Sequence, residues 1–112
     1  MSNLLSKKCI PCEGGTPPLT EVEISEYLKQ VSGWNVMIDH EGEIKNIVKD
    51  FKFKDFAEAM AFANKIAALA EEEGHHPDLK VSWGKVGVEL STHAVGGLSE
   101  NDFILAAKID SL

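Results

Sequence analysis

Histidines are the residues of this 112-residue sequence best suited to chemistry. His75 and His76 are adjacent and are followed by Pro77, and His93 follows Ser91 and Thr92. Imidazole, with an unperturbed pKa of about 6.5, can both give and take a proton near neutral pH. Any one of the three, taken alone, would more often be a surface or capping residue. Together they predict a general acid–base site.

Composition excludes several classes of protein. With 112 residues and 44% hydrophobic content, the chain fits one domain with a modest core. Lys and Arg number 11 against 18 for Asp and Glu, and the resulting charge of −7 opposes a phosphate backbone, so no nucleic-acid binding is expected. The sequence lacks an apolar run of about 20 residues and a signal-peptide core, so we expect a cytoplasmic protein that does not enter a membrane.

The two cysteines, Cys9 and Cys12, form a C-x-x-C within a partly irregular N-terminal extension over residues 1–18. A redox pair would stand at the start of a helix that follows a strand, whereas Pro11 separates these cysteines and Gly14 follows them. Two cysteines and two histidines could also complete a tetrahedral zinc site. A zinc-binding structural protein therefore remains an alternative.

The main domain, residues 19–112, begins with a helix and a strand pair. Thr20 and Glu23 form a capping box that predicts a helix over 21–31, ended by Gly33. Alternation predicts strands over 34–38 and 43–53, with the solvated His40 in the turn between them. The second strand changes its alternation midway, which predicts a bulge or a bend.

The second half of the main domain repeats the order of one helix and two strands. A capping box at Asp55 and Glu58 opens a long helix that ends at Glu73. Alternation over 79–91 predicts a hairpin with its turn at Gly84-Lys85 and with Trp83 in the first strand, and a last helix runs over 100–109. The predicted fold class is α+β, with a four-stranded antiparallel sheet and three helices on one face in the order α-β-β-α-β-β-α.

The hairpin register brings the histidines together. His75 and His76 precede its first strand, and His93 ends its second. A turn at Gly84-Lys85 would place His93 opposite His76, on strands about 4.8 Å apart. This register predicts one shared site.

Several of these residues belong to an ordered motif: Glu71-x-x-x-His75-His76-Pro77, then Trp83, Ser91-Thr92-His93 and Gly97-Leu98-Ser99-x-x-Asp102. With Gly33-Trp34 and the segment 51–56, it closely resembles the pterin-4a-carbinolamine dehydratase family over roughly residues 19–109. The C-x-x-C extension is similar to that of bacterial members.

The resemblance implies an enzyme that removes water from 4a-hydroxytetrahydropterin, giving the quinonoid dihydropterin in tetrahydropterin recycling, without a metal or organic cofactor. It implies three catalytic residues, His75, His76 and His93. It implies a substrate-binding set of Gly74, His75, His76, Pro77, Ser91, Thr92, His93 and Ala94, and supporting residues Glu71, Asp102 and Trp34.

Dehydration needs an acid for the departing 4a-hydroxyl and a base for a ring N–H proton. We expect His75 and His93 to be exchangeable acids, and His76 to orient the pterin and accept the ring proton. Animal members often have a carboxylate before the histidine pair, where this chain has Gly74. A carboxylate that steers His75 would then come from Glu71, Asp78 or Asp102.

Association is also expected. Edge strands and alanine-rich helices favour a homodimer or a homotetramer. Animal relatives double as dimerisation partners of a transcription factor, so a protein-binding module of the same fold is a second alternative.

Overall fold

The computed structural model describes residues 4–9 and 17–112 as one sheet covered by helices. The elements, in chain order, are η1 (Leu4–Ser6), α1 (Glu21–Leu28), β1 (Asn35–Ile38), β2 (Ile44–Lys52), α2 (Phe56–Glu73), β3 (Asp78–Ser82), β4 (Lys85–Leu90), η2 (His93–Val95) and α3 (Glu100–Asp110). The predicted α+β class and element order are confirmed.

The sheet is antiparallel, in the order β1-β2-β4-β3. The pairing of β1 with β2 shifts between Met37 and Ile38, because Lys45 is an extra residue on β2. This bulge confirms the predicted irregularity and lets Ile44 and Ile47 both pack on the core despite their odd spacing. Asn46 and Val48 consequently face the opposite side of the sheet.

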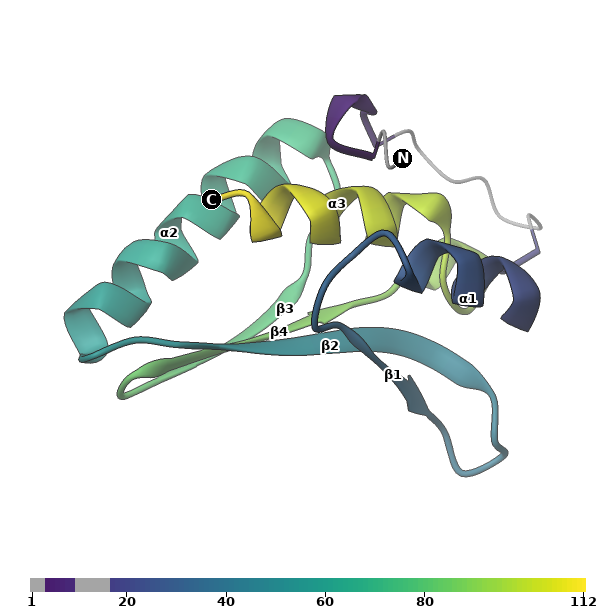
Figure 1. The fold of residues 1–112 in the computed structure, drawn as a ribbon, viewed down its shortest axis with the longest axis horizontal. Helices are drawn as coiled ribbons and strands as arrows, with labels where there is room; N and C mark the ends of the chain where they lie inside the picture. Colours follow the sequence, from purple (N-terminus) through teal and green to yellow (C-terminus); the bar gives the residue numbers. More distant parts are fainter. Residues whose placement is uncertain (1–3, 10–16) are drawn as a thin grey trace.

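All three α-helices lie on one face of the sheet (Figure 1). That inner face of β4 carries Val86, Val88 and Leu90, each at most 2% exposed. Helix α3 packs most deeply, and seven consecutive residues from Asn101 to Ala107 are buried. The helix lies between the sheet and other parts of the chain, so its polar residues Asn101 and Asp102 are buried with the rest.

Two local predictions were wrong. The hairpin turn is Trp83-Gly84, with Lys85 already in β4, because Gly84 takes the positive φ of +71° that the turn requires. This displaces the register by two residues: Asp78 pairs with Glu89, and Trp83 lies in the turn, 74% exposed. Helix α1 also ends at Leu28 rather than at residue 31.

The N-terminal segment contributes to the core. Leu4 is 1% exposed, and η1 packs on α3. Lys7 Nζ donates to Glu100 Oε2 at 2.6 Å, and the Cys9 amide donates to Glu73 Oε1 at 2.9 Å. These contacts tie residues 4–9 to the start of α3 and to the end of α2.

Leu4→Ala tests this packing. We expect the substitution to lower the free energy of unfolding by about 2–5 kcal/mol, because it removes a buried side chain and leaves a cavity. Leu5 is the matched control, since its side chain is 58% exposed and Leu5→Ala should change stability by less than about 0.5 kcal/mol. Urea denaturation measures both values, and equal small losses would show that Leu4 does not stabilise the core.

Candidate active site

The candidate site is built at the junction of α2, β3, β4 and α3. Helix α2 ends at Glu73 and is capped by Gly74, which adopts φ +68° and donates its N–H to Ala70 O at 2.9 Å. Glycine adopts this left-handed conformation without steric cost, and the conformation turns the chain away from the helix axis. His75 follows at once, and its N–H also reaches Ala70 O, at 3.2 Å. The helix end therefore holds His75 close to α3.

Asp102 is the centre of a buried hydrogen-bond network. Its carboxylate is fully buried and accepts from His75 Nε2 at 2.6 Å through Oδ1. Its other oxygen, Oδ2, accepts from Thr92 Oγ1 at 2.7 Å and from the Ser99 N–H at 3.0 Å. Since the Thr92 hydroxyl proton is used, the Ser99 hydroxyl donates to Thr92 Oγ1, at 2.8 Å. The network joins the segment after α2, the segment after β4 and the start of α3.

His76 faces a different environment. Its Nε2 pairs with Glu71 Oε2, and the two side chains are 61% and 77% exposed. An exposed ion pair of this kind contributes little to stability. Of the three carboxylates considered for His75, the structure thus places Asp102 against His75 and Glu71 against His76.

His93 lies in a short loop after β4. The backbone of Thr92 bonds that of Gly97 in both directions, at 2.8 and 3.4 Å, which closes the loop around η2. A Cβ atom at Gly97 would lie 3.0 Å from Pro18 Cβ, so Pro18 leaves little room for a side chain here. His93 and Ala94 are exposed on this loop.

A pocket of about 280 Å³ opens beside His93. Its wall includes Asn46, Asp78, Glu89, Ser91, Thr92 and His93. The structure therefore groups Ser91, Thr92 and His93 in one cavity. Asn46 and Glu89 have no local sequence pattern that marks them as site residues, and only the sheet pairing brings them beside His93.

The structure links His75 to the neighbour of His93 by a route other than the predicted one. The predicted register, which placed His93 opposite His76, was wrong, and β3 and β4 pair only as far as Asp78 and Glu89. His75 instead shares Asp102 with Thr92, the residue before His93. Gly74, His75, His76 and Pro77 belong to the same junction but do not form the wall of the His93 pocket.

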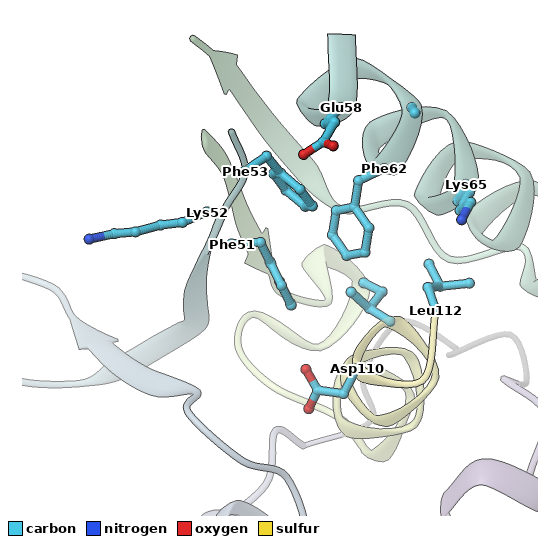
Figure 2. Close-up of a pocket in the computed structure, with 10 residues that line it drawn as sticks. Phe51, Lys52, Phe53, Glu58, Phe62, Lys65, Asp110 and Leu112 are labelled. Atoms are coloured by element: carbon cyan, nitrogen blue, oxygen red, sulfur yellow. The ribbon is translucent and has the colours of Figure 1, made fainter. Parts of the chain in front are cut away.

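Trp34 contacts the other end of α3. Its Nε1–H donates to the Asp110 carboxylate at 3.1–3.2 Å, and its ring meets Phe51 edge-on at 6.2 Å. Asp110 lies eight positions after Asp102, which is about 12 Å along a helix. Phe51 and Asp110 line a second pocket, of about 480 Å³, with Phe53, Phe62 and Leu112 (Figure 2). None of the predicted site residues lines that pocket.

Cys9 carries an unreactive thiol. Burial first, and then the Glu73 carboxylate, raise the pKa of Cys9 to about 12, so the thiol is protonated at neutral pH. The Lys108 ammonium, 2.7 Å from Glu73, and the Cys9 amide hold the pKa of Glu73 below its usual value. Cys12, the other half of the motif, lies outside the described residues. Among residues 4–9 and 17–112, no three His, Cys, Asp or Glu side chains are grouped to hold a metal.

The fold and the site define a small α+β protein with a histidine–carboxylate network at one end of its sheet. The sequence model of the pterin 4 alpha carbinolamine dehydratase family matches residues 17–112, and the chain belongs to this family. No helix in the described part of the chain is long and apolar enough to cross a membrane.

Sequence relatives match over nearly their whole length. A protein of Alkaliphilus metalliredigens is 53% identical over 98% of this chain and 96% of its own, and one of Rickettsia canadensis is 53% identical over 99% and 98%. Both carry the name "Putative pterin-4-alpha-carbinolamine dehydratase".

Two solved structures are also similar. A transcriptional coactivator/pterin dehydratase from Brucella melitensis has a TM-score of 0.75 and 36% identity, over 84% of this chain and 96% of its own. A pterin dehydratase-like protein identified as a RuBisCO assembly factor in the alpha-carboxysome has a TM-score of 0.58 and 26% identity, over 70% and 87%.

Thr92→Val tests the network around Asp102. Valine keeps the shape of threonine but removes the hydroxyl, leaving Asp102 Oδ2 without one donor and the Ser99 hydroxyl without its acceptor. We expect a loss of about 1–3 kcal/mol in unfolding free energy. Thr92→Ser, which keeps the hydroxyl, should lose less, and equal losses in the two variants would contradict the assigned bonds. Chemical denaturation provides the comparison.

Proposed function

We propose that this protein is a dehydratase that removes water from 4a-hydroxytetrahydropterin and releases the quinonoid dihydropterin, in the cytoplasm and as part of tetrahydropterin recycling. The observation that carries the proposal is the contact between His75 and the buried Asp102 carboxylate, 2.6 Å apart. The same carboxylate accepts a hydrogen bond from Thr92, which lines the pocket together with His93. Family membership supports the choice of substrate.

His75 is suited to the role of acid. Asp102 holds its Nε2 and so fixes the orientation of the ring, while placing a negative charge beside the imidazolium form. The side chain of His75 is only 12% exposed, which limits competition from solvent. Proton transfer from such a group turns the 4a-hydroxyl into water, a far better leaving group than hydroxide.

The remaining steps need a base and a second acid. As the C–O bond breaks, the ring nitrogen loses its proton to a base, and the freed electron pair forms the C=N bond. His93, on the wall of the pocket, is the second candidate acid on the other side of the 4a carbon. His76 is the proposed base, which orients the pterin ring and accepts the proton from the ring nitrogen. Its Nε2 pairs with the Glu71 carboxylate.

Self-association is part of the proposal. The edge strand β1 exposes Met37 and Ile38, at 49% and 60%, and the start of α2 exposes Phe56 at 48%. Apolar side chains on an open sheet edge and on an uncovered helix favour burial against a second copy. We expect sedimentation to give the mass of a homodimer or a homotetramer, and a monomer at micromolar concentration would contradict this.

Histidine substitutions test the chemistry. His75→Ala and His93→Ala should each lower kcat by about 10²-fold or more on synthetic 4a-hydroxytetrahydropterin, because each removes a proton-transfer group. His40→Ala is the matched control, since the side chain of His40 is 92% exposed and lies in the β1–β2 turn. Stopped-flow absorbance follows the dehydration.

Two results would decide against the proposal. Wild-type turnover in both site variants would refute the assigned roles, and no acceleration by the wild-type protein would refute the dehydratase itself and favour the protein-binding alternative. Turnover that persists in a chelator would exclude an obligatory zinc ion, and its loss would favour the zinc alternative.

A further inference from the structure

We propose that Asn46, Glu89 and Asp78 form the subsite that binds the donor edge of the pterin, the 2-amino group and N3–H of its pyrimidine ring. The inference rests on the proposed function and names the part of the substrate that the His93 pocket recognises. The three side chains belong to three different strands and share that pocket with His93.

Sheet pairing places the three residues in a row. Asp78 on β3 is directly opposite Glu89 on β4, and Glu89 is opposite Val48 on β2. Asn46 lies two residues before Val48 and therefore on the same face, diagonal to Glu89. Opposite residues have Cβ atoms about 5 Å apart and diagonal ones about 7–8 Å. Glu89 stands between Val88 and Leu90, which pack on the core, so it and the row lie on the other face of the sheet. The helices cover only the core side (Figure 1).

The three residues offer acceptors that the rest of the described chain does not satisfy. Asn46 Oδ1 is buried from solvent and has no hydrogen-bond partner among the described residues. Buried polar atoms of this kind are rare, since each costs free energy. Asp78 and Glu89 are like charges on directly opposed positions, which is unfavourable, and no lysine of the described chain pairs with either.

This set of acceptors suits a ligand rich in donors. The 2-amino and N3–H groups of a pterin present three N–H bonds along one edge, which carboxylate and amide oxygens can accept. The volume of about 280 Å³ is near the lower limit for small-molecule sites and suits a two-ring ligand. Holding the donor edge here leaves the other ring free to lie toward His93.

Two ligands test the subsite: a 7,8-dihydropterin, and the same molecule with a 2-methyl group in place of the 2-amino group. We expect wild-type protein to bind the amino compound about 100-fold more tightly, because the methyl compound leaves the buried Asn46 Oδ1 and the acceptors of the pocket carboxylates without N–H donors. Glu89→Gln and Asn46→Leu should each reduce this preference to about tenfold or less. Asp50→Asn removes a carboxylate from the same face outside the pocket and should keep the full preference. Isothermal titration gives each dissociation constant, and circular dichroism verifies folding.

The outcomes separate the subsite from the dehydratase. A preference lost in Glu89→Gln and kept in Asp50→Asn supports the subsite, even if Asn46→Leu does not fold. Wild-type turnover combined with equal affinity for the two ligands, or with a preference that survives in Glu89→Gln, overturns the subsite and leaves the dehydratase standing. No wild-type binding and no turnover would overturn both.

Discussion

Asp102 places a carboxylate with no exposed surface at the start of α3, where it accepts hydrogen bonds from His75, Thr92 and the Ser99 backbone. Burying a carboxylate costs free energy unless hydrogen-bond donors surround it. Moving any of these three donors away from Asp102 would therefore destabilise the fold. Each donor comes from a different segment. The order of the junction between α2, β4 and α3 therefore depends on this one side chain.

The network also reaches the His93 pocket. Thr92 donates to Asp102 and lines that pocket together with the next residue, His93, which lies on an exposed loop. His75 contacts the same carboxylate. Asp102 therefore links the segment that carries His75 to the pocket that contains Asn46, Glu89 and His93.

The N-terminal segment supports this junction from the other side of α3. Glu73 is the last residue of α2. Its side chain is 3% exposed and accepts from both Lys108 Nζ and the Cys9 amide. The end of α2 is therefore fixed one residue before Gly74 and two before His75. Residues 4–9 thus stabilise the end of α2 through packing and hydrogen bonds. This role needs no reactive cysteine, in agreement with the raised pKa of Cys9.

Local patterns in the sequence determined the elements. A capping box at Thr20 and an N-cap bond at Asp55 specified where α1 and α2 begin, because these hydrogen bonds lie within four residues. Alternation specified the inner face of β4, and the broken alternation of β2 indicated its bulge. The ordered histidine motif indicated the family, which the sequence model confirms.

Tertiary structure decided what depends on pairing between distant residues. The positive φ of Gly84 places the hairpin turn one residue earlier than predicted. Because the turn fixes which residues of β3 and β4 are paired, His93 is not opposite His76 as predicted. The choice of Asp102 over Glu71 and Asp78 as the partner of His75 needed the packing of α3 against the end of α2. Asn46 and Glu89 reached the His93 pocket only through the pairing of β2 with β4, a contact between segments about 40 residues apart that no local pattern encodes.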